Sequence, residues 1–225
     1  MDKKYELTDD TIEVDGSTLY RIRAVRDFGL VRKGSLGGYI ATEKNLSHDG
    51  HAWVYDNARV YGNALVVGNA WICDNACVCG NANVRDRAYV GDDAHVCDNA
   101  LVFGNAWVID NAYICNDACI YNNAHIYDNA RVSSATIYGD ARIGSDAIIE
   151  GTEDYMMFGP FGSRNETTTI YYTANGAKVI CGCFHGTLSS FRDKVKHTHG
   201  DNHYAKEYLA IADIAELRFG KKEEE

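Results

Sequence analysis

The residues best suited to bind a charged ligand lie close together near the C-terminus, in the segment from Gly159 to Thr169. Its glycines let the backbone approach a ligand, and its hydroxyl and free N–H groups can bind anions. Arg164 adds a guanidinium group that can hold a carboxylate or a phosphate through two parallel hydrogen bonds. The segment is not a Walker loop, because it lacks the Gly-Lys-Ser/Thr ending.

We expect these residues to form an anion site, which the turn from His199 to His203 could complete. The expected ligand-binding residues are Ser163, Arg164, Asn165, Thr167, Thr168, His199, Asp201 and Asn202. The alternative interpretation is a linker loop in which Arg164 makes a structural salt bridge, followed by a simple turn between two helices.

A second group of residues has the chemistry of zinc ligands: Cys181, Cys183 and His185, followed by three further histidines at 197, 199 and 203. Cys-x-Cys on a strand puts both thiols on one face without the knuckle geometry of a Cys-x-x-Cys site, and no second Cys pair follows. We therefore predict that Cys181 and Cys183 are a packed pair of small residues. We expect no metal, no cofactor and no catalytic residue.

The element that must position these residues is a six-residue repeat, which runs without interruption from Val54 to Arg131. Each repeat contains an aliphatic residue, an outward residue, a two-residue turn, an Ala and a second outward residue. The first turn residue is Gly, Asp or Asn, and the second is mostly Asn. Ala and the aliphatic residue lie two apart and share one face of a very short strand. Asn and Gly suit the turn because they tolerate positive φ, and a repeated Asn can also pair its side chain with neighbouring backbone. Repeats this regular predict a solenoid.

The repeat resembles that of the hexapeptide-repeat left-handed parallel β-helix proteins, including the YdcK-like proteins. The resemblance implies a mainly β, triangular solenoid with Ala and Val/Ile filling its thin interior. The entry segment from Gly37 to Tyr55 also looks like the start of such β-helices, with a two-residue bulge after Leu46. The repeat loses one residue between Val132 and Ala135 and stops at Gly151.

Residues eighteen apart in a triangular solenoid stack on one flat face. One face carries an outward aromatic column that ends at His125, a second carries a column of cysteines, and a third carries an apolar column. Monomers rarely expose large apolar patches, so we expect an oligomer interface on these columns. The resemblance implies a homotrimer, and a ligand-stacking platform on the Trp column is the alternative. The expected interface residues are Trp53, Trp71, Tyr89, Trp107, Leu65, Leu101 and Phe103.

The flanks of the repeat differ from it in kind and predict three parts: a cap over residues 1–39, the β-helix over 40–151 and a C-terminal α+β module over 152–225. Asp15-Gly16 predicts an N-terminal β-hairpin, and Asn175-Gly176 predicts a second one. Thr187 and Asn202 can cap helices over about 188–198 and 203–219. The expected order of the module is ββαα, which resembles the C-terminal modules of phage and prophage β-helix proteins.

Composition excludes several classes of function. A net charge of −10 argues against nucleic-acid binding, which needs clustered Lys/Arg. The sequence contains no apolar run of the kind that forms a signal peptide or a membrane span, so we expect a cytoplasmic protein. Six of the eight cysteines follow the repeat at outward positions, which favours free thiols in a reducing compartment.

These observations favour a non-catalytic oligomeric binding protein. If the phage resemblance holds, it implies a counter-defence protein that sequesters a small anionic, nucleotide-like signal or blocks a host protein. One alternative is a hexapeptide-repeat acyltransferase that uses acetyl-CoA, with His95 or His125 as base, although the repeat has no loop insertion and no orienting carboxylate is predictable. The other alternative is a structural assembly or spacer protein.

Overall fold

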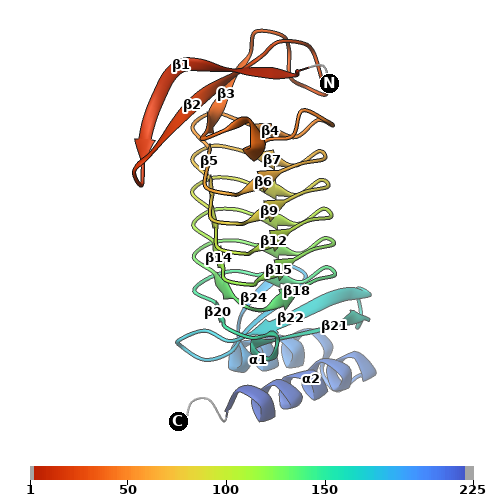
Figure 1. The fold of residues 1–225 in the computed structure, drawn as a ribbon. Helices are drawn as coiled ribbons and strands as arrows, with labels where there is room; N and C mark the ends of the chain where they lie inside the picture. The colour runs from red at the N-terminus through yellow and green to blue at the C-terminus, as the bar shows by residue number, and fades with distance from the viewer. Residues whose placement is uncertain (1–2, 221–225) are drawn as a thin grey trace.

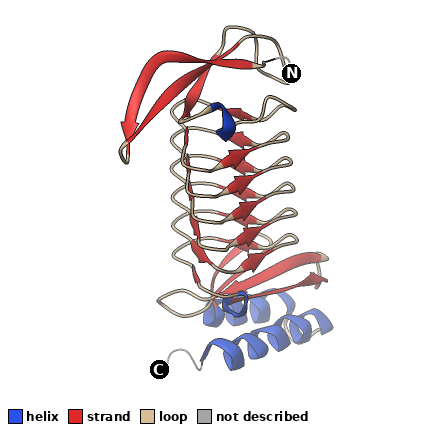
Figure 2. Ribbon diagram, in the orientation of Figure 1, coloured by secondary structure: helices blue, strands red, loops and turns tan. Residues whose placement is uncertain are grey.

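The computed structural model describes residues 3–220, so the ends of the predicted ranges 1–39 and 152–225 lie outside the described residues. It confirms a mainly β chain that is built on a three-sided parallel β-solenoid (Figure 1). An N-terminal hairpin lies at one end of the solenoid, and a sheet with two helices lies at the other (Figure 2).

Three sheets form the sides of the solenoid, and each is named here by its outward residues. The Trp face consists of β4 (Trp53–Val54), β7 (Trp71–Ile72), β10 (Tyr89–Val90), β13 (Trp107–Val108), β16 (His125–Ile126) and β19 (Arg142–Ile143). The Leu face consists of β6 (Leu65–Val66), β9 (Asn83–Val84), β12 (Leu101–Val102), β15 (Cys119–Ile120) and β18 (Thr136–Ile137). The Cys face consists of β5 (Arg59–Val60), β8 (Cys77–Val78), β11 (His95–Val96), β14 (Tyr113–Cys115), β17 (Arg131–Ser133) and β20 (Ile148–Ile149), and the N-terminal strands extend its sheet.

The core follows the six-residue pattern. The inward Ala and Val/Ile residues of the repeat, such as Ala94 and Val96, are fully buried. Along the Trp face, Tyr89 pairs with Trp107 and Trp107 pairs with His125, which is the expected spacing of eighteen. After the one-residue deletion the spacing becomes seventeen, because His125 pairs with Arg142. The deletion therefore shortens one turn and leaves the faces aligned.

The turns use their Asp and Asn side chains to connect successive rungs. Asp74 and Asp98 both have φ 57°, in the left-handed region. The Asp92 N–H donates to Asp74 Oδ2 at 3.3 Å, one rung away. Asn side chains form their own ladder, in which Asn81 Nδ2 donates to Asn99 Oδ1 at 3.0 Å. These Asn side chains therefore bond to each other between rungs, and not to backbone as the sequence suggested.

The N-terminal cap is a hairpin of β1 (Tyr5–Val14) and β2 (Ser17–Ala24), followed by β3 (Leu36–Ile40) and a 3-10 turn at Glu43–Asn45. The cap covers the first rung of the Trp face, where the Trp53 ring lies 5.3 Å from Phe28 and 6.1 Å from Tyr5 between centroids. Trp53 is only 1% exposed. The expectation that Trp53 forms part of an exposed interface column is therefore wrong, because its side chain is already buried within its own chain.

The C-terminal module has four strands before its helices, so the predicted order ββαα is incomplete. The strands are β21 (Tyr155–Phe161), β22 (Glu166–Tyr171), β23 (Lys178–Cys181) and β24 (Phe184–Thr187), preceded by a 3-10 turn at Thr152–Asp154. The helices are α1 (Leu188–His199) and α2 (His203–Phe219), and the predicted N-caps are correct: Thr187 accepts from Ser190 N and Asn202 from Ala205 N.

The sheet of this module lies between two cores. Tyr155, Tyr171 and Ile180 belong to the same hydrophobic cluster as the solenoid interior and close its lower end. Ile170 and Val179 belong to the cluster beneath α1 and α2. Alternate residues of the sheet thus face the solenoid and the helices, which fixes the module against the last rung. Within residues 3–220, no helix has the length and apolar character needed to span a membrane.

Candidate anion-binding site

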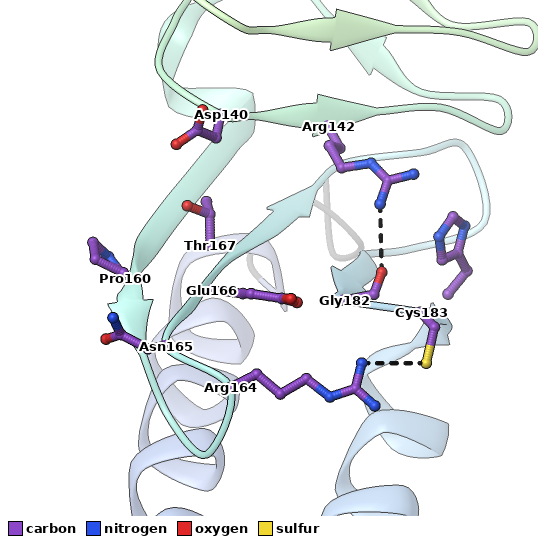
Figure 3. Close-up of a pocket in the computed structure, with 10 residues that line it drawn as sticks. Asp140, Arg142, Pro160, Arg164, Asn165, Glu166, Thr167, Gly182 and Cys183 are labelled. Carbon is purple, nitrogen blue, oxygen red and sulfur yellow. Dashed lines mark hydrogen bonds between the residues drawn. The ribbon is translucent and has the colours of Figure 1, made fainter.

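A cleft of about 880 Å³ lies where the last rung of the Trp face meets the C-terminal module (Figure 3). Its walls come from three places: the solenoid, the β21–β22 hairpin and the turn between β23 and β24. It is lined by Asp140, Arg142, Pro160, Arg164, Asn165, Glu166, Thr167, Gly182, Cys183 and His185.

Arg142 enters the cleft from the solenoid. Its backbone N–H donates to Thr169 Oγ1 at 3.1 Å, where a further rung would otherwise supply a carbonyl. Its Nη1 donates to the carbonyl oxygen of Gly182 at 3.4 Å. The last outward residue of the Trp face is therefore held by strand β22 behind it and by the β23–β24 turn in front.

Arg164 enters the cleft from the opposite side, on the loop between β21 and β22. Asn165 beside it has φ 52°, which gives the loop its tight turn. Arg164 Nη1 donates to the Cys183 thiol at 3.6 Å (Figure 3). Arg164 and Arg142 thus reach consecutive residues of one turn, Cys183 and Gly182, from two separate parts of the chain.

Gly182 permits this close approach. It has φ 57°, and a Cβ at this position would lie 2.9 Å from Glu166 Oε2 and 3.0 Å from Arg164 Nη1. A larger residue would be strained in the left-handed region and would also push both side chains out of place. The turn at Gly182 is therefore as much a part of the site as the arginines.

The charges of the cleft are mixed. Among residues 3–220, neither Arg142 nor Arg164 makes a salt bridge; the described ion pairs involve other residues, such as Arg192 with Asp213 and Lys3 with Glu43. Glu166 is nevertheless a negative neighbour of Arg164, and Asp140 lines the cleft beside Arg142. Both guanidinium groups are exposed and keep N–H donors available for a ligand.

The residues predicted for the site are only partly brought together. Arg164, Asn165 and Thr167 line the cleft, while Ser163 and His199 line an adjoining cavity of about 100 Å³ that also contains Arg164 and Cys183. Thr168 is fully buried in the sheet and lines neither cavity. Asp201 and Asn202 also line neither cavity.

Several lining residues were not predicted to bind the ligand, notably Arg142, Glu166 and His185, the last of which was considered only as a possible zinc ligand. Arg142 follows the six-residue pattern, so nothing marked it as different from the other outward residues. Arg142 could have been recognised from the sequence only by its position, because it lies in the last repeat of its face, next to the start of the C-terminal module.

The two cysteines near the cleft behave as free thiols. Cys183 is exposed and Cys181 is half-buried; burial raises the pKa of the Cys181 thiol. Within residues 3–220, no group of three or more His, Cys, Asp or Glu side chains is arranged to hold a metal ion. All eight cysteines are free.

The Trp face continues from this cleft toward the N-terminal cap as an aromatic column. The Tyr89 and Trp107 rings lie 5.2 Å apart between centroids, and those of Trp107 and His125 lie 5.4 Å apart and almost parallel, at 3°. Burial lowers the pKa of the His125 imidazole, and Arg142 adds to the effect. His95 lies on the Cys face and stacks on Tyr113 instead, so the two histidines considered as bases do not share a site.

Comparison with known families supports the repeat. The family model described as the YdcK beta solenoid repeat matches residues 52–68 and 58–74. These residues include the four strands β4, β5, β6 and β7, next to the cap. A search of curated proteins finds no match.

Proposed function

We propose that this protein is a non-catalytic binding protein whose cleft holds a small anion that carries a phosphate or carboxylate group. The observation that carries the proposal is the convergence of Arg142 and Arg164. Two guanidinium groups from different parts of the chain line one open cleft, and neither is neutralised by a salt bridge among the described residues. Arginine forks match the planar geometry of carboxylate and phosphate oxygens.

The size and lining of the cleft are consistent with a small molecule. A volume of about 880 Å³ lies within the range of ligand pockets. Asn165 and Thr167 add an amide and a hydroxyl beside the arginines. The site is also held rigidly, because Arg142 lies on a rung of the solenoid and Gly182 lies on a tight turn between paired strands. Binding a ligand therefore costs little conformational entropy.

The biological role in this proposal rests on the resemblance of the C-terminal module to those of phage and prophage β-helix proteins. In that setting the protein would be a counter-defence protein that sequesters a small nucleotide-like signal or blocks a host protein. Assembly through the exposed columns of the solenoid, as a homotrimer, would place several such clefts on one particle.

The test is isothermal titration calorimetry with inorganic pyrophosphate. Arg164→Ala and Arg142→Ala should each weaken binding about 10-fold or more, the scale of a charge-assisted hydrogen bond. Arg164→Lys should also bind more weakly, because an ammonium cannot form the bidentate fork. Arg131→Ala is the matched control, since Arg131 is exposed on the Cys face, away from the cleft. Equal pyrophosphate binding by wild type, Arg142→Ala and Arg164→Ala would refute the proposal.

A further inference from the structure

Three cavities form one continuous surface along the Trp face. The first, about 650 Å³, contains Trp71, Tyr89 and Trp107 beside the cap residue Leu30. The second, about 500 Å³, shares Trp107 with the first and contains His125. The second cavity also shares Asp140 and Arg142 with the arginine cleft. The aromatic column and the arginine cleft are therefore not separate features of the surface.

The chemistry of this surface changes along its length. Trp107 is 45% exposed although it stacks between Tyr89 and His125. His125 has an aromatic partner only on the Trp107 side among the described residues, and the next rung on its other side is Arg142. From Trp107 to Arg142 the surface thus passes, over two rungs or about 10 Å, from aromatic rings to a guanidinium group.

Asp140 lies at the junction of the two cavities, in the turn that precedes β19. Its Oδ1 accepts a hydrogen bond from Asn123 Nδ2 at 2.9 Å, which orients the carboxylate. The Oδ2 atom can accept hydrogen bonds from neutral hydroxyl groups. Asp140 lies in the same rung as Arg142 and beside the column of Trp107 and His125, so it can meet hydroxyl groups of a ligand that joins a ring to an anionic group.

We infer that the ligand of the arginine cleft belongs to the nucleotide class, with its base against His125 and Trp107, its ribose hydroxyls at Asp140 and its phosphates at Arg142 and Arg164. The inference rests on the proposed function and adds to it the aromatic half of the site. The base packs against the outward edges of the Trp107 and His125 rings, and these contacts are lost to an anion that has no ring.

The experiment compares ADP with inorganic pyrophosphate by calorimetry, because the two probes share a diphosphate group and differ in the nucleoside. Wild-type protein should bind ADP at least 10-fold more tightly than pyrophosphate. Trp107→Ala and His125→Ala should bring ADP affinity close to that of pyrophosphate and leave pyrophosphate affinity unchanged. Tyr121→Ala is the matched control, since Tyr121 lies in a stacked column next to the Leu face. Melting curves check that each variant is folded.

Tryptophan fluorescence gives a second readout that is specific to this surface. ADP should quench the emission of the wild-type protein, and Trp107→Phe should remove most of the quenching while the buried Trp53 continues to emit. If pyrophosphate binds in an Arg164-dependent manner but ADP binds no more tightly, the nucleotide inference is overturned and the anion site stands. If neither probe binds, the proposed function fails and the inference fails with it.

Discussion

The Lys4 ammonium donates a hydrogen bond of 2.7 Å to the backbone carbonyl of Ala52, and the Lys4 side chain is fully buried. This contact joins the N-terminal hairpin to the start of the first Trp-face rung. Burial lowers the pKa of Lys4 to about 8, and the nearby Arg26 adds to the effect. The hairpin is therefore attached to the solenoid through an ammonium group that is costly to keep charged.

The lowered pKa of Lys4 predicts a specific pH dependence of stability. Between pH 8 and about 10.5 the unfolded chain holds the proton and the folded chain does not, so the free energy of unfolding should rise with pH. Lys4→Met removes this titration. The unfolding free energy of wild type minus that of Lys4→Met, from urea melts, should therefore increase from pH 8 to 10.5 and stay constant from pH 6 to 7. A difference that falls with pH across the upper window would contradict the prediction.

Trp53 and Trp107 occupy the same face at different rungs and should differ strongly in their effect on stability. Trp53 is 1% exposed beneath the cap, whereas Trp107 is 45% exposed. Trp53→Ala should reduce the free energy of unfolding by about 3–5 kcal/mol through a cavity, and Trp107→Ala by about 1 kcal/mol through lost stacking. Urea denaturation measures both, and similar losses in the two variants would show that the cap does not anchor on Trp53.

The difference between these tryptophans also shows what the sequence could and could not predict. The period of six residues determines which side chains point inward, so the core, the face assignments and the effect of the deletion at Val132–Ala135 were predictable. Burial of Trp53 depends on Phe28 and Tyr5, which lie outside the repeat and reach it only through the folded cap. No local pattern encodes such a contact.

The candidate site was predictable only where local composition marked it. Arg164 stood out because its segment does not follow the repeat. Strand β21 was missed because Gly159 and Pro160 resemble a loop, yet they lie within a strand that pairs with β22. Arg142, Gly182 and His185 join the site through tertiary packing between the last rung and the β23–β24 turn, so their roles needed the structure.

The inward register can be tested on one short strand. Val96 is fully buried and His95, its neighbour in β11, points outward and is exposed. Val96→Ala should lower the free energy of unfolding by about 1–3 kcal/mol because it leaves a cavity in a narrow core. His95→Ala should change it by no more than about 0.5 kcal/mol. Thermal or urea melts in which His95→Ala is the more damaging substitution would contradict this register.

The Leu face provides the test of oligomer formation. Leu101 is 37% exposed and Phe103 is partly exposed close to it, while Leu65 is partly exposed two rungs away, beyond Asn83. We expect these side chains to be buried between protomers of a trimer, so Leu101→Asp should dissociate it by placing a charge in an apolar contact. Sedimentation velocity at micromolar concentration measures the result. A wild-type protein that sediments as a monomer would refute the expected trimer.

Glu166 gives the sharpest test of how the arginine cleft works, because its carboxylate can either oppose an anion or hold Arg164 in place. Glu166 Oε2 and Arg164 Nη1 both lie next to Gly182, and the carboxylate is a negative neighbour of the guanidinium. Glu166→Gln keeps the shape and removes the charge. If repulsion dominates, pyrophosphate should bind several-fold more tightly to Glu166→Gln than to wild type, and the difference should shrink as salt is raised from 50 to 500 mM, since the charges are exposed. Weaker binding by Glu166→Gln would instead assign the carboxylate a positioning role, in which it keeps Arg164 directed into the cleft.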